Sequence, residues 1–277
     1  IDLFIKMLFL IFMLVGYKNS SNLGFLIGKF IGPIFKSRSS IINNLKEVKI
    51  INNDNLKEIS NNVFGNYGRI FSEYVHLKNF RNNRLNKFIS IDGKEYLENI
   101  VKQNKKVVFI SGHFNNFELM AMQLEKLGVN LAAIYRPLNN IYLNKTMEHL
   151  RKNFICKKQI KKGRSGSREL IKNFKDGASI ALMIDQRVRE GININFFDKL
   201  APTTTIPAQL VKKYNCEVVP IYIERKEKFF FKMNILNPIS FKNNESIEEI
   251  TLHLNKILEK MILKNIDQWI WTHNRWK

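Results

Sequence analysis

The chain has 277 residues, 45% of them hydrophobic, and a formal net charge of +21 at pH 7. This length allows one large α/β domain or two small ones, with enough apolar residues for a substantial core. Two cysteines, Cys156 and Cys216, exclude a disulfide framework. The absence of Cys-x2-Cys and His-Glu-x2-His motifs argues against a metal site.

The positive charge is spread over many segments, without the long basic tail that is typical of a nucleic-acid-binding arm. Aromatic residues lie mostly in apolar runs, whereas single-strand binders alternate them with arginine. The charge therefore favours anionic membrane lipid as a partner, and not nucleic acid. A compositional excess of Lys, Asn and Ile is an alternative explanation. A non-enzymatic basic membrane-binding or nucleic-acid-binding module also stays open as an interpretation.

The first 40 residues carry the strongest membrane signal. Residues 3–15 are apolar except for Lys6, although about 20 residues are needed to cross a bilayer. No small-x-small cleavage site follows, which disfavours a signal peptide, and a buried core helix is the other alternative. Residues 23–35 are glycine-spaced and broken by Pro33, and basic residues follow at 36–38. We expect residues 1–40 to form a membrane anchor and an interfacial helix, and residues 41–277 to form the catalytic α/β domain.

The segment 107–119, VVFISGHFNNFEL, contains the principal candidate site. Its apolar start predicts a buried strand, and its end predicts a helix with Asn115 or Asn116 as the N-cap. His113 would then lie beyond the carboxyl end of a strand, where open α/β sheets bind ligands.

The spacing of His113 and Glu118 suggests a catalytic pair. Five residues apart on one helix, the two side chains would point about 140° apart, but a turn can bring them together. A carboxylate that accepts a hydrogen bond from one ring nitrogen leaves the other free as a general base. The alternative is a structural histidine beside a glutamate that complements the helix dipole.

Two further predicted strands also end in polar residues. Residues 129–135 are followed by Arg136, whose guanidinium could bind a phosphate or a phosphopantetheine, or could simply lie on the surface. Residues 178–184 are followed by Asp185 and Gln186. We expect His113, Arg136 and Asp185 to converge in one catalytic cleft.

The densest basic run is KKQIKKGRSGSR, residues 157–168. Gly163 and Gly166 precede a helix predicted at 167–175, so backbone N–H groups and Arg164 could bind an anion. A solvated basic loop is the alternative, and such a loop could still recognise an acidic protein partner.

The remaining segments predict structure more than chemistry. Residues 195–205 predict an aromatic loop that could line an apolar ligand, and a helix follows at 207–214. Residues 218–224 and 229–237 predict a hairpin. Residues 246–264 predict an amphipathic helix capped by Ser246. The tryptophans of the tail 269–276 fit either a core or an interfacial belt.

The sequence resembles the bacterial lipid A biosynthesis (lauroyl/myristoyl) acyltransferases, whose motif is His-x4-Asp/Glu, over nearly its whole length. The family's Gly-Asn-Trp within that motif is Asn115-Asn116-Phe117 here, and its FFG is Phe196-Phe197-Asp198. The resembling segments, in chain order, are LGFLIGKFIG, NYGR, GHFNNFE, YRP, DQR, NFFDKLAPTTTIPAQL, VVPIYIER and HNRWK.

The resemblance implies a glycerolipid-acyltransferase-like mixed sheet flanked by helices, with His113 and Glu118 as catalytic residues. It also implies a functional arginine at Arg151, where Ile155 replaces a family glycine four residues later. The implied reaction moves a fatty acyl chain from an acyl carrier protein or coenzyme A thioester to a phosphorylated glycolipid, at the cytoplasmic face of the bacterial inner membrane. No other cofactor is implied. A glycerophospholipid acyltransferase of the lysophosphatidic acid type is the alternative.

Overall fold

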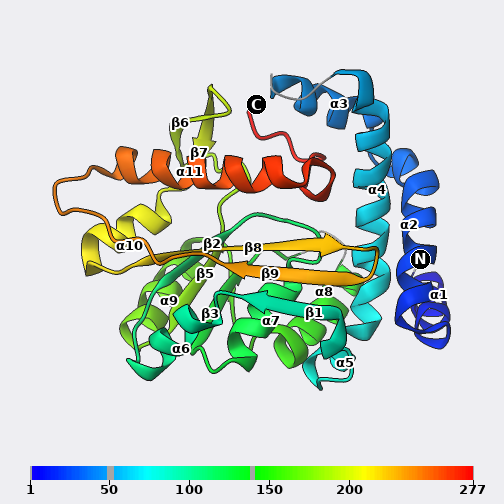
Figure 1. The fold of residues 1–277 in the computed structure, drawn as a ribbon, viewed down its shortest axis with the longest axis horizontal. Helices are drawn as coiled ribbons and strands as arrows, with labels where there is room; N and C mark the ends of the chain where they lie inside the picture. Colours follow the sequence, from blue (N-terminus) through cyan, green and yellow to red (C-terminus); the bar gives the residue numbers. More distant parts are fainter. Residues whose placement is uncertain (1, 49–52, 138–140, 277) are drawn as a thin grey trace.

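The computed structural model describes residues 2–48, 53–137 and 141–276, which fold around one mixed sheet (Figure 1). The strands are β1 (Ile89–Asp92), β2 (Val108–Ser111), β3 (Leu131–Tyr135), β4 (Lys158–Lys161), β5 (Ser179–Met183), β6 (Ile192–Phe196), β7 (Lys199–Thr203), β8 (Val218–Lys226) and β9 (Phe230–Ile235). The α-helices are α1 (Asp2–Leu14), α2 (Gly16–Phe35), α3 (Arg38–Glu47), α4 (Leu56–Glu73), α5 (Leu77–Arg81), α6 (Lys94–Lys102), α7 (Glu118–Lys126), α8 (Ile141–Leu150), α9 (Arg164–Lys175), α10 (Ile206–Tyr214) and α11 (Ile247–Lys264). Short 3-10 turns are η1 (Asn53–Asn55), η2 (Tyr74–His76), η3 (Asn86–Phe88) and η5 (Ile266–Gln268), and η4 (Arg151–Ile155) is a π-helix.

The central sheet has the strand order β1-β9-β8-β2-β5-β3-β4 within the described residues. Every neighbouring pair is parallel except β8 and β9, which form the predicted antiparallel hairpin. Strand β2 lies between β8 and β5, and all four of its residues are buried. The expected α/β class with a central mixed sheet flanked by helices is therefore confirmed.

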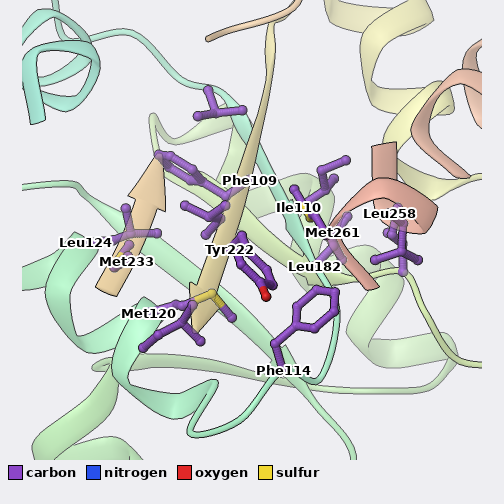
Figure 2. Close-up of a cluster of buried hydrophobic side chains, with 14 of the residues drawn as sticks. Phe109, Ile110, Phe114, Met120, Leu124, Leu182, Tyr222, Met233, Leu258 and Met261 are labelled. Carbon is purple, nitrogen blue, oxygen red and sulfur yellow. The ribbon is translucent and has the colours of Figure 1, made fainter. Parts of the chain in front are cut away.

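The core fills the two faces of this sheet (Figure 2). Met120 and Leu124 extend from α7 toward one face, and Leu258 and Met261 extend from α11 toward the other. The helix α11 begins with the predicted cap: the Ser246 side chain accepts a hydrogen bond from the Glu249 N–H, and Glu249 completes a capping box. Helices thus cover both faces of the sheet (Figure 2), as parallel sheets require.

The N-terminal helices pack on the domain through α4, which lies beside α2 in Figure 1. Glycines allow this close approach: a Cβ atom on Gly68 would lie 1.9 Å from the Gly24 carbonyl oxygen. The prediction that Pro33 breaks the segment is wrong, because α2 continues through it to Phe35. A proline loses only one helical hydrogen bond, and this one lies in the last turn.

Large apolar side chains remain exposed on the outer surface of α1 and α2. No helix among residues 2–48, 53–137 and 141–276 is both long enough and apolar enough to cross a membrane. The exposed side chains are Met7, Leu10, Ile11, Met13 and Leu14 on α1 and Leu26, Phe30, Ile31, Ile34 and Phe35 on α2.

Three local predictions are corrected. Residues 195–205 do not form a loop, because β6 and β7 pair as an antiparallel hairpin. The basic run contains the edge strand β4, and the helix after it begins at Arg164 rather than residue 167. The side chains of Asn115 and Asn116 do not cap α7, whose N-cap position is Phe117.

Candidate active site

His113 follows β2 in the turn that leads to α7, and Asp185 follows the neighbouring strand β5. Ser111 pairs with Met183 in the sheet, so each of the two residues lies two positions beyond a paired residue. The His113 Nδ1 atom lies 2.8 Å from Oδ1 of Asp185, and the His113 backbone N–H donates to Oδ2 at 2.8 Å. Trp269 Nε1 also donates to Oδ2, at 2.9 Å. The Asp185 carboxylate is fully buried, and these three hydrogen bonds fix its position.

For both residues of this pair, burial shifts the pKa in one direction and the partner residue shifts it in the other. Burial favours the neutral imidazole, but the charge and hydrogen bond of Asp185 outweigh it and raise the pKa of His113 above its usual value. Burial likewise disfavours the carboxylate, yet His113 and Trp269 lower the pKa of Asp185. Asp185 therefore stays ionised at neutral pH, and the imidazole can hold a proton that it has accepted.

A buried network fixes the turn itself. Asn115 has a left-handed backbone, with φ of 43°, and its N–H donates to the Gln268 carbonyl oxygen at 2.8 Å. Asn116 Nδ2 donates to Glu73 Oε2 at 3.0 Å, and Glu73 also pairs with Arg225 at 2.8 Å. The turn is thus tied to α4, to β8 and to the C-terminal segment, which limits movement of the imidazole.

The predicted hydrogen bond between His113 and Glu118 is wrong. Glu118 begins α7 and accepts hydrogen bonds from Tyr74 and from Arg151 Nε, the latter at 2.8 Å. Arg151 Nη2 lies 2.6 Å from the same Glu118 oxygen. The first turn of α7 directs Glu118 toward η4, while the turn before it directs His113 toward β5. A π-helical turn such as η4 is frequent at functional sites.

His113 opens onto a cavity of about 500 Å³ at the carboxyl ends of β3 and β5. Glu118, Arg136, Arg151 and Gln186 line the same cavity, so the expected convergence of strand ends is observed. Asp185 lies behind His113 and is not among the lining residues. Arg164 begins α9, and its side chain lies outside what is described.

Arg151 has unused hydrogen-bonding capacity. Its Nη1 atom is buried and has no hydrogen-bond partner among the described residues. Burial opposes the charge of this side chain, but Glu118 and Tyr74 together raise the pKa of Arg151 further above its usual value. Arg151 therefore brings a permanent positive charge to the wall of the cavity that holds His113.

Three residues of the site were not assigned from the sequence. Trp269 holds Asp185, Tyr74 holds Glu118, and His273 lines the cavity wall. The sequence offered only weak signals: His273 begins the resembling segment HNRWK but had no assigned role, Trp269 lies four residues before it, and Tyr74 lies five residues after the segment NYGR. Trp269 and Trp271 are buried, so the tail belongs to the core, not to an interfacial belt.

Several known proteins are similar to this chain. The profile of the family described as bacterial lipid A biosynthesis acyltransferase matches residues 1–277. The lipid A biosynthesis palmitoleoyltransferase of Escherichia coli is 25% identical over 263 residues, which cover 92% of this chain and 84% of that protein. The lipid A biosynthesis acyltransferase of Haemophilus influenzae is 27% identical over 207 residues, 70% of this chain and only 62% of that protein. The crystal structure of the 1-acyl-sn-glycerophosphate acyltransferase from Thermotoga maritima aligns with a TM-score of 0.44 and 15% identity, covering 92% of this chain and 100% of that chain.

Proposed function

Since the chain belongs to the bacterial lipid A biosynthesis acyltransferase family, we propose that it transfers a fatty acyl chain from an acyl carrier protein thioester to a hydroxyl group of a phosphorylated glycolipid, a lipid A precursor. The observation that supports this most directly is the His113–Asp185 pair at the wall of a cavity of about 500 Å³. Asp185 occupies Nδ1, which leaves Nε2 as the base.

The reaction needs one proton relay and no covalent acyl-enzyme. His113 Nε2 removes the proton from the acceptor hydroxyl, and the oxygen attacks the thioester carbonyl carbon. The new C–O bond forms, the C–S bond breaks, and the departing thiolate takes the proton back from His113. Asp185 stabilises the imidazolium between these steps. We assign the guanidinium of Arg151, which lines the cavity, to stabilise by its positive charge the carbonyl oxygen as it becomes negative.

Glu118 acts in this proposal through Arg151, not through His113. Its carboxylate holds the guanidinium by two contacts and is itself held by Tyr74. Glu118 is therefore a positioning residue. In this proposal the acid of the His-x4-acid motif orients the Arg151 guanidinium, which stabilises the negative carbonyl oxygen.

The proposed location is the cytoplasmic face of the inner membrane. The exposed apolar side chains of α1 and α2 would enter the lipid, and the high positive charge would favour anionic headgroups. Flotation of the purified protein with anionic vesicles, but much less with zwitterionic vesicles, is expected. Binding that is equally weak to both would contradict this location.

A competition assay tests the reaction. The purified protein receives one acyl carrier protein thioester together with a lipid A precursor and lysophosphatidic acid, and mass spectrometry identifies the acylated lipid. Acylation of the glycolipid is expected, and selective acylation of lysophosphatidic acid would establish the alternative glycerophospholipid reaction. His113→Ala should lower turnover by about 100- to 10,000-fold, as for loss of a general base. A basic membrane-binding module without enzyme activity would instead keep all its properties in this variant.

A further inference from the structure

A second and larger cavity, of about 930 Å³, adjoins the one that holds His113. The two cavities share Arg136, Lys162, Val188 and His273 in their walls. The larger cavity is lined mainly by residues of α3, of the segment after β5 and of the C-terminal segment. The catalytic cavity therefore continues directly into this second space.

The second cavity is strongly basic. Six cationic side chains line it, whereas Glu47 and Glu190 are its acidic residues, and Glu47 pairs with Lys199. Within the described parts of the chain, none of the six cations forms an ion pair. The six are Lys36, Lys46, Arg136, Lys162, Arg187 and Arg189, and all are exposed. So many uncompensated charges in one concavity raise the local concentration of anions.

The wall between the two cavities is well anchored. The Arg187 backbone N–H donates to His273 Nε2 at 3.1 Å, and Asn44 Nδ2 donates to the carbonyl oxygens of Trp271 at 2.8 Å and His273 at 3.1 Å. These bonds join α3, the segment after β5 and the C-terminal segment. Burial lowers the pKa of His273, which fits a neutral ring that accepts a hydrogen bond. The cations of the cavity are thus carried on a fixed frame.

We propose that this basic cavity is a phosphate-binding subsite, which holds a phosphate ester of a substrate while the reacting group reaches His113. The proposal rests on the proposed acyl transfer, because it assumes that the adjoining cavity is catalytic. A phosphate fits the cavity's chemistry, since guanidinium groups bind its oxygens in pairs and lysines add charge. The ester could belong to the acceptor glycolipid or to the phosphopantetheine arm of the donor, and these share the same chemistry.

Equilibrium binding to the full-length chain tests the subsite. The Arg187→Gln/Arg189→Gln variant removes two exposed cations without touching the core. The Lys172→Gln/Lys175→Gln variant, on α9, removes the same charge outside both cavities. Three probes distinguish the ligand: glucosamine 1-phosphate, 4′-phosphopantetheine and unphosphorylated glucosamine.

The chain should bind at least one of the phosphorylated probes and bind glucosamine much more weakly. The Arg187→Gln/Arg189→Gln variant should weaken phosphate-ester binding about tenfold or more, since charge-assisted contacts are lost, and the α9 variant should not. The probe that is bound identifies the source of the phosphate. Equal binding by the two variants, or no preference for phosphorylated probes, would overturn the subsite.

This outcome is separable from that of the acyl-transfer proposal, because binding is measured without turnover. A chain that acylates glycolipid but shows no arginine-dependent phosphate binding keeps the proposed function and loses the subsite. A chain that binds the phosphate through Arg187 and Arg189 but transfers no acyl group keeps the subsite as an anion site and loses the reaction.

Discussion

His113 and Asp185 lie 72 positions apart in the sequence, yet the Nδ1 atom of one is 2.8 Å from Oδ1 of the other. Their strands β2 and β5 are parallel neighbours, so their carboxyl ends place the two side chains at the same level. This contact, and not the local spacing of His113 and Glu118, defines which acid orients the imidazole.

Asp185→Asn should therefore be the most damaging conservative substitution of an acid in the site. The amide keeps the shape but loses the charge that stabilises imidazolium, and it can favour the wrong tautomer. By analogy with other histidine–aspartate pairs, kcat should fall about 10,000-fold. Steady-state kinetics and a thermal melt would be measured together. A folded variant with less than about a tenfold loss of kcat would contradict the orienting role of Asp185.

The pH profile should show the same pair. A general base must be neutral, and Asp185 raises the pKa of His113 above 6.5 even though burial acts in the opposite direction. The acidic limb of kcat/KM should therefore have its midpoint above 6.5, with activity lost as the pH falls through it. In Asp185→Asn the midpoint of the residual activity should move to lower pH. An unmoved midpoint would mean that another group titrates.

Glu118 and Arg151 should behave as one unit in a double-mutant cycle. Glu118→Gln should lower kcat about 100-fold by misplacing the guanidinium, and Arg151→Gln should have a similar effect. The double variant should be little worse than either single variant, so the coupling energy should approach the ~2.7 kcal/mol of one 100-fold loss. Glu118→Gln combined with Asp185→Asn is the comparison pair, because no contact joins those two carboxylates. Additive effects of Glu118→Gln and Arg151→Gln would show that the ion pair has no role in catalysis.

The sequence was sufficient to predict the elements that depend on local patterns. The apolar runs of β2, β3 and β5 and the Ser246 cap of α11 lie where expected, because burial and capping leave direct signals in neighbouring residues. His113, Arg136 and Gln186, which follow these strands, also line one cavity, as expected from strands that end at the same edge of the sheet.

Side-chain partners could not be predicted in the same way. The sequence placed two acids, Glu118 and Asp185, near His113 in the predicted cleft. Which of them contacts the imidazole depends on the direction of the backbone at the start of α7. The basic cavity combines residues from segments between Lys36 and Trp276. Such a site depends on the order of the strands in the sheet and on the path of the C-terminal segment, and neither leaves a periodic pattern of residues in the sequence.

The β6–β7 turn offers a stabilising substitution. Phe197 and Asp198 have φ values of 52° and 59°, as in a type I′ turn, whose second position favours glycine. Asp198→Gly should raise the free energy of unfolding by about 1 kcal/mol, because it removes the Cβ atom that strains the left-handed conformation. The ion pair with Lys256, at 3.5 Å on a largely exposed carboxylate, contributes little against this. Asp198→Ala keeps a Cβ and should not stabilise, so equal urea midpoints for the two variants would refute the argument.

The packing of α2 on α4 should be intolerant of a single methyl group at Gly68. Two effects oppose each other there, because alanine favours a helix over glycine by about 1 kcal/mol. The added Cβ would lie 1.9 Å from the Gly24 carbonyl oxygen, so the helices must separate along their contact. Overpacking of this kind costs about 1–3 kcal/mol, and a backbone atom cannot move aside as a flexible side chain can. Gly68→Ala should therefore lower the urea midpoint, whereas Lys57→Ala, at an exposed position of the same helix, should change it little. A more stable Gly68→Ala protein would show that helix propensity outweighs the close approach of α2 and α4.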